Sequence, residues 1–245
     1  MMGHGHATTG AGAWVALTAT GAGALGVVPM EPAQVAAGAL VTAGAALLPD
    51  ADHHNGTIAH SLPPFSNVLT RVVGEISGGH RHGTHSVLGV LAFFALAWVL
   101  APLRIDLPGG VHDDFQIGAW TIIVVMVSFA LKALRLTPGK VAPWAASVPL
   151  ATAAVWFAPE QLWWLPLSVG VGALIHVIGD MLTIQGVPLL WPLRPKPAVE
   201  TPLWKKNGHF AVPVLGNAGS VREWVFVMAL NVYIAYVLGG TFGLW

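Results

Sequence analysis

The sequence predicts an all-α membrane protein, in which about seven transmembrane helices form a single domain over residues 1–245. The first observation is composition: 55% of the residues are hydrophobic and only 9% are charged, whereas soluble domains carry about 25% charged residues. The second is a series of long apolar stretches, and the third is a one-sided distribution of Lys and Arg. Together with a mean hydropathy of +0.68, these exclude an ordinary soluble protein.

Seven apolar stretches approach the length of about 20 residues that a helix needs to cross the hydrocarbon core. The first two are rich in glycine and alanine, which lets helix backbones pack closely. The fifth is the weakest, because prolines lie within it and directly after it, so a re-entrant or surface helix is the alternative there. Long cytoplasmic loops are expected at about 50–83 and 186–220. The expected spans are 11–28, 32–49, 84–101, 115–136, 143–158, 161–182 and 221–240.

Three further features limit the class of protein. Cysteine is absent, which excludes disulfides, thiolate zinc sites and cysteine nucleophiles. The formal net charge is zero, so the overall balance gives no reason to expect nucleic acid as a partner. No Lys or Arg precedes the first apolar stretch, so we expect that stretch to be a retained span rather than a cleaved signal peptide.

Lys and Arg indicate the orientation in the membrane. With seven spans, only Arg104 falls on one face, and the other ten of the 11 basic residues fall on the opposite face. Cytoplasmic loops are the ones enriched in Lys and Arg, so the amino terminus is predicted to be cytoplasmic. All histidines except His112 follow the same division. The ten basic residues are Arg71, Arg81, Lys132, Arg135, Lys140, Arg194, Lys196, Lys205, Lys206 and Arg222.

Several potential metal ligands fall at the predicted cytoplasmic ends of the spans. His176 and Asp180 are four residues apart and therefore share one helix face. Such a pair is costly within a membrane unless it faces protein, water or an ion, and a hydrogen-bonded His–Asp pair is the simpler alternative. Asp50 and Asp52 end the second span, however, and His85 opens the third. Because potential ligands fall at the same predicted end of several spans, a shared metal site is favoured.

Imidazole and carboxylate groups suit divalent ions such as zinc, and a catalytic ion takes about three protein ligands and a water. One or two zinc ions are predicted, with Asp50 or Asp52 as the bridging carboxylate. His80 or the unligated carboxylate of that pair would move the proton, and Arg81 would bind a phosphate or else simply mark the cytoplasmic side. The catalytic candidates are thus His80, Arg81 and Asp52. The expected metal ligands are His6, Asp50, Asp52, His53, His85, His176 and Asp180.

Four blocks in order, residues 5–6, 47–53, 79–86 and 176–192, resemble the YdjM family of inner-membrane proteins, which are assigned as metal-dependent hydrolases. The resemblance covers most of the chain, including residues 216–217 and 222–223. It implies a bacterial or archaeal inner-membrane protein, with a distant kinship to zinc-dependent phospholipases C and nucleases, and hence a zinc cluster that acts on phosphoesters. His82 departs from the family pattern, which puts its role as a ligand in doubt.

The predicted function is a membrane-embedded, metal-dependent hydrolase that uses metal-activated water. A phosphoester is the favoured substrate, including a lipid or lipid-linked one, and membrane lipids are the expected partners. A transporter of divalent ions, or a proton-coupled one, is the first alternative, because intramembrane His and Asp mark ion pathways. The outer halves of the spans offer it little beyond Thr121, Thr152 and Ser168. The second alternative is a metal-stabilised scaffold that recruits a cytoplasmic regulator.

Overall fold

The computed structural model describes residues 1–110 and 113–245, so the prediction made for His112 lies outside the described part. The described residues confirm an all-helical fold: they form α-helices and short 3-10 turns, with isolated β-bridges and no β-strand. The helices are α1 (Gly3–Thr18), α2 (Pro32–Ala45), α3 (Phe65–Ser77), α4 (Val87–Leu100), α5 (Ile117–Ala133), α6 (Ala142–Phe157), α7 (Leu165–Met181) and α8 (Val221–Thr241). The 3-10 turns are η1 (Leu48–Asp52), η2 (Gly83–His85), η3 (Pro108–Gly110) and η4 (Pro159–Gln161).

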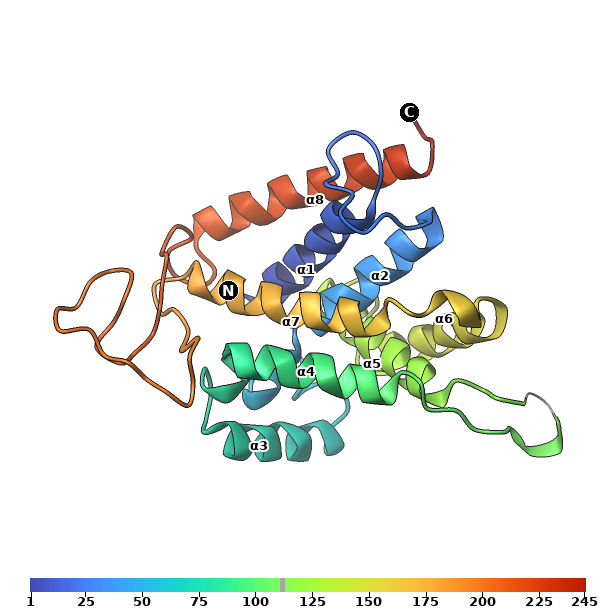
Figure 1. The fold of residues 1–245 in the computed structure, drawn as a ribbon, viewed down its shortest axis with the longest axis horizontal. Helices are drawn as coiled ribbons and strands as arrows, with labels where there is room; N and C mark the ends of the chain where they lie inside the picture. The colour runs from blue at the N-terminus through green and yellow to red at the C-terminus, as the bar shows by residue number, and fades with distance from the viewer. Residues whose placement is uncertain (111–112) are drawn as a thin grey trace.

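Helices α2 and α7 lie in the middle of the bundle (Figure 1). Helix α2 packs against α1, α5 and α7, while α7 also packs against α1 and α4. The close approach depends on glycine: a Cβ added to Gly44 would lie 1.8 Å from the carbonyl oxygen of Met126, and one added to Gly10 would lie 2.7 Å from that of Thr42. The small residues of the first two spans therefore bring the helix backbones together.

Within the described residues, three helical stretches are long and apolar enough to cross a membrane, namely Pro32–Asp52, Pro159–Met181 and Val221–Thr241. Helices α4, α5 and α6 are apolar as well, but they have only 14, 17 and 16 residues. The membrane character of the chain is therefore supported. The count of seven spans is not confirmed and stays a prediction.

The first helix lies earlier in the chain than predicted. Expected over 11–28, it instead covers Gly3–Thr18. Gly21, Gly23 and Gly26 have φ values of 113°, 86° and 59°, a region that glycine adopts without strain and that a right-handed helix cannot contain. Glycine thus ends the helix early, and the shift places His6 within its first two turns.

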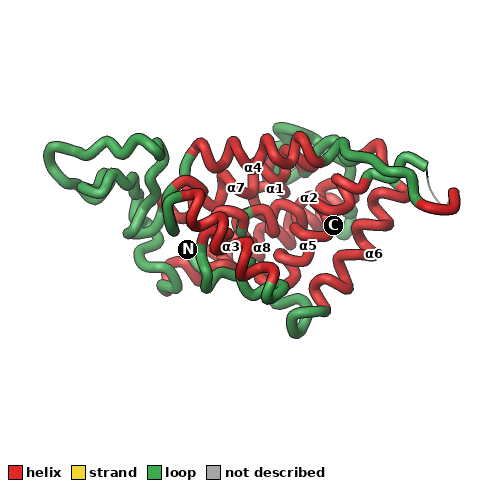
Figure 2. The backbone as a smooth tube through the Cα atoms, turned by 90° about the horizontal axis from the view of Figure 1, so that it is seen from below, coloured by secondary structure: helices red, strands yellow, loops and turns green. Residues whose placement is uncertain are grey.

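The predicted loop 50–83 contains a helix that the sequence analysis did not assign, because α3 occupies Phe65–Ser77 between η1 and η2. The second predicted loop, 186–220, has no α-helix among its residues, all of which the structure describes. It extends away from the bundle at the end where the amino terminus lies (Figure 2). Both segments border the end of the bundle that carries the site.

Candidate metal centre

Five segments distant in sequence bring His and Asp side chains together at one end of the bundle. The first turns of α1 supply His6, η1 supplies Asp50 and Asp52, the turn after α3 supplies His80 and Arg81, η2 supplies His85, and the end of α7 supplies His176 and Asp180. Pro49 at the start of η1 fixes its own φ near −65° and so helps end the regular helix α2 before the aspartates. The predicted gathering of these groups is thus present.

His176 is completely buried and oriented by the backbone. Its Nδ1 donates to the carbonyl oxygen of Ala46 at 2.7 Å, so the Nε2 atom is left to face the cluster. That atom lies 3.1 Å from Nε2 of His85, 3.7 Å from Oδ1 of Asp50 and 3.8 Å from Oδ2 of Asp180. A carbonyl that holds one ring nitrogen is the usual outer-shell partner of a metal-binding histidine.

His6 stacks on His176 with a ring separation of 3.6 Å and an angle of 11° between the ring planes. Its Nε2 lies 3.3 Å from Oδ1 of Asp180, whereas its Nδ1 is buried and has no hydrogen-bond partner. The terminal ammonium of Met1 also contacts Asp180. Through Nε2, His6 therefore adds an imidazole nitrogen to the cluster next to Asp180.

The ligand atoms form three overlapping groups, each of which falls within 4.8 Å. Asp50 belongs to two of them, and so do His85 and His176. This donor set of imidazole nitrogens and carboxylate oxygens fits a borderline divalent cation such as zinc. The groups are Asp50, Asp52, His80 and His85; His6, Asp50 and His176; and His85, His176 and Asp180.

Asp52 is the acceptor around which the turn 80–85 is organised. Its Oδ1 accepts from Nδ1 of His80 at 2.8 Å, while its Oδ2 accepts from the backbone N of Arg81 at 3.1 Å and from Oγ1 of Thr84 at 2.6 Å. Nδ1 of His85 lies 3.3 Å from the same Oδ2. With its side chain buried and its oxygens engaged, Asp52 orients His80 and His85.

The exposed side of the cluster is formed by Asp50 and His80, whose side chains are 21% and 37% accessible. His53 lies next to them, with its ring 4.3 Å from that of His80, but it belongs to none of the three groups among the described residues. Its pKa is lowered by burial and by the neighbouring His80. His80 therefore reaches both the cluster and solvent, and His53 lies at the edge.

Arg81 has the left-handed backbone conformation, with φ of 58°, which is uncommon outside glycine. Its guanidinium donates to the carbonyl oxygen of Gly186 at 3.2 Å and lies 3.0 Å from Oδ2 of Asp180. Arg81 thus links the turn before η2 to α7 and to the loop after α7, and its charge is already paired with Asp180. These contacts identify it as a residue that positions Asp180.

His85 lies between two carboxylates, with Nε2 at 3.6 Å from Oδ1 of Asp50 and Nδ1 at 3.3 Å from Oδ2 of Asp52. Burial opposes the protonated form, but the nearby carboxylates of Asp50 and Asp52 outweigh it and raise the pKa of His85 from the usual 6.5 to about 9. In the metal-free protein the imidazolium balances part of the carboxylate charge. A metal ion that uses His85 must displace this proton.

Two polar residues near the cluster were given no role in the site by the sequence analysis. Thr84 donates to Asp52, as described above, and Glu223 of α8 holds the amino-terminal segment. The Glu223 side chain is 1% exposed and accepts from the backbone N of Met2 and of Gly219, each at 2.8 Å. The buried charge of Glu223 in an otherwise apolar span could have been a signal.

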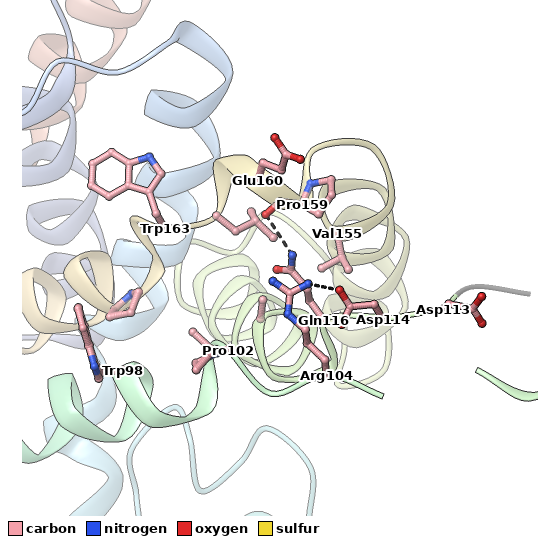
Figure 3. Close-up of a pocket in the computed structure, with 14 residues that line it drawn as sticks. Trp98, Pro102, Arg104, Asp113, Asp114, Gln116, Val155, Pro159, Glu160 and Trp163 are labelled. Atoms are coloured by element: carbon pink, nitrogen blue, oxygen red, sulfur yellow. Dashed lines mark hydrogen bonds and ion pairs between the residues drawn. The ribbon is translucent and has the colours of Figure 1, made fainter. Parts of the chain in front are cut away.

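A cavity of about 750 Å³ lies at the opposite ends of α4 and α7 from the metal ligands. Figure 3 shows Trp98 and Trp163 beside it, together with the ion pair between Arg104 and Asp114 at 2.6 Å. Gln116 donates to the carbonyl oxygen of Pro159 at 3.2 Å across the same region. The cavity and the cluster are therefore separate features.

Comparison with known proteins identifies the family of the chain. The sequence pattern described as YdjM inner membrane protein matches residues 1–244. The chain is 26% identical over 191 residues to the inner membrane protein YdjM of Escherichia coli (strain K12) and equally to that of Shigella flexneri. The match covers 78% of this chain but only 61% of each relative. No solved structure matches the chain. The chain belongs to the YdjM family of inner membrane proteins, and it is a multi-pass protein of that membrane.

Proposed function

We propose that the chain is a metal-dependent hydrolase that acts on a phosphoester at the cytoplasmic face of the inner membrane. The observation that carries the proposal is the sharing of Asp50, His85 and His176 between overlapping groups of ligand atoms. Groups that share ligands suit one ion or two adjacent ions, and paired ions are used in the hydrolysis of phosphoesters. The ring of His6, which stacks on that of His176, adds a further imidazole to this set.

A bound divalent ion would supply Lewis acidity and lower the pKa of a water ligand toward about 7. His6, Asp50, His85, His176 and Asp180 would hold it, with zinc as the first candidate. Proton transfer would be carried out by residues on the exposed side of the cluster. Asp52 fixes the Nδ1–H tautomer of His80, so the Nε2 of His80 is free to accept a proton from water.

Elemental analysis of the detergent-purified protein tests the proposal at its first step. The wild type is expected to retain a stoichiometric divalent metal, whereas His176→Ala and Asp180→Ala should lose it. His54→Ala is the matched control, because His54 is exposed and, among the described residues, its side chain has a hydrogen bond to Asn55 and a ring contact with His53. A wild type without stoichiometric metal would contradict the proposal.

The second test of the proposal measures turnover. The metal-loaded protein is expected to hydrolyse a chromogenic phosphoester or a phospholipid, and His80→Gln should retain metal while losing turnover. When the same metal-loaded protein is reconstituted into proteoliposomes, flux of divalent ions should not exceed background, because transport is the competing function. Metal flux without hydrolysis would favour the transporter instead.

A further inference from the structure

Helix α3 has three different faces along its 13 residues. One stripe is small and polar and points inward: Ser66, Thr70 and Ser77 are 6%, 2% and 7% exposed. A second stripe is large, apolar and exposed. It consists of Phe65 (74%), Val68 (59%), Leu69 (52%), Val72 (44%) and Ile76 (77%).

The third stripe of α3 is polar and exposed, and it consists of Asn67, Arg71 and Glu75. At 100° per residue, each stripe covers about a third of the helix circumference. The apolar stripe is therefore flanked by protein on one side and by polar side chains on the other. A helix in water would bury its apolar stripe against the protein, and α3 does the reverse.

We propose that α3 is an interfacial helix whose apolar stripe inserts among the lipid acyl chains of the leaflet on the side of the cluster. The chain is an inner membrane protein, so acyl chains are available to cover this stripe. Figure 1 shows α3 at the lower edge of the molecule, outside the central helices. An apolar face next to a charged face is typical of helices that lie in the membrane interface.

The polar stripe sets how α3 lies in the leaflet. A helix inserted along the membrane normal would expose Arg71 and Glu75 to hydrocarbon, which is costly. A helix that lies along the interface keeps these side chains among the headgroups, where Arg71 can pair with lipid phosphate. Lipid acyl chains thus cover the apolar stripe, and the polar stripe faces headgroups and water.

The helix also connects to the cluster. A Cβ added to Gly74 would lie 3.1 Å from the carbonyl oxygen of Asp52, so the inward face of α3 lies directly against η1. After Ser77, the chain passes through Gly78 and Gly79 to His80. Insertion of α3 would therefore hold the exposed side of the cluster close to the boundary between lipid and water.

The chain has no cysteine, so single-cysteine spin labelling tests the insertion without background. Labels at Val68→Cys, Val72→Cys and Ile76→Cys are compared with labels at Asn67→Cys and Glu75→Cys, all in full-length protein. The vesicles contain phosphatidylethanolamine and phosphatidylglycerol. The ratio of oxygen collisions to nickel-chelate collisions is expected to be several-fold higher on the apolar stripe, and Val225→Cys on the exposed face of α8 serves as the lipid reference.

Two results would overturn the proposal. Equal access of the nickel chelate to both stripes would show that the apolar stripe faces water. Protection of the apolar stripe from both reagents would show that protein covers it, either a second copy or another chain. Neither result depends on metal or turnover, so the test is independent of the proposed hydrolase activity.

Discussion

The imidazole of His176 is fixed by a single backbone group, because its Nδ1 donates to the carbonyl oxygen of Ala46 at 2.7 Å. Ala46 lies at the end of α2, four residues before Asp50. The contact therefore ties α7, which carries His176, to the end of α2, which leads into η1 and Asp50, and it selects the ring nitrogen that faces the cluster.

Loss of a residue that only orients a metal ligand weakens metal binding by about 10–100-fold. We expect His176→Ala to weaken it by more than this. The cause is the loss of a ligand nitrogen shared by two of the three groups. Competition with a chromogenic zinc chelator measures the affinity. His54→Ala should match the wild type, and an unchanged affinity in His176→Ala would place the ion elsewhere.

The second prediction concerns Thr84, whose hydroxyl donates to the buried Asp52 at 2.6 Å. Thr84→Val keeps the shape and removes the donor, and hydrogen bonds to charged groups contribute about 1.5–3 kcal/mol. The free energy of unfolding in detergent should therefore fall by about 1.5–3 kcal/mol. Thr121→Val is the control, since Thr121 is exposed and donates only to the carbonyl oxygen of Ile117 in its own helix. Equal effects in both variants would argue against a structural role for the contact with Asp52.

Hydropathy predicted several of the helices well, because long apolar runs have few alternatives in a membrane. The expected span 221–240 corresponds to Val221–Thr241, and 143–158 corresponds to Ala142–Phe157 despite Pro149. The method failed at α1, whose buried first turns contain His6, Thr8 and Thr9. A buried polar helix has no hydropathy signal.

Helix α3 was missed for a related reason. Its apolar residues follow helical spacing from Phe65 to Ile76 but are interrupted by polar ones, so they form no long apolar run of the kind that indicates a span. In the candidate metal centre, the spacing within a single segment was enough to predict two pairs of ligands, His176 with Asp180 and Asp50 with Asp52. The contacts of Arg81 with Asp180 and of Glu223 with Met2 link residues about 100 and 221 positions apart, and no local pattern encodes such pairs.

The third prediction follows from the pKa of His85, raised to about 9 by Asp50 and Asp52. Below that pH the protonated ring competes with the metal, so apparent affinity should rise about tenfold per pH unit until it levels off near the pKa. Isothermal titration with zinc in two buffers of different ionisation enthalpy counts the released proton. In the metal-free protein, the stability that comes from this raised pKa is present below the usual 6.5 and lost as pH rises through about 9. An affinity that does not vary with pH would show that His85 is not a ligand.

The fourth prediction tests the packing that brings α2 to the cluster. Gly44 faces the backbone of α5 so closely that an added Cβ would lie 1.8 Å from the carbonyl oxygen of Met126. Two backbones must separate to accept Gly44→Ala, and overpacking of this kind costs about 1–3 kcal/mol or more. We expect a lower melting temperature in detergent and weaker metal binding, because Asp50 follows the same helix.

The matched control for this test is Gly240→Ala near the end of α8, where the added Cβ would lie 3.6 Å from Nε1 of Trp245 in ordinary contact. Alanine is favoured over glycine within a helix by about 1 kcal/mol, so this variant should be neutral or slightly more stable. If Gly44→Ala also melts at the wild-type temperature, α2 and α5 are farther apart than described. Loss of metal with unchanged melting would instead indicate a local displacement of η1.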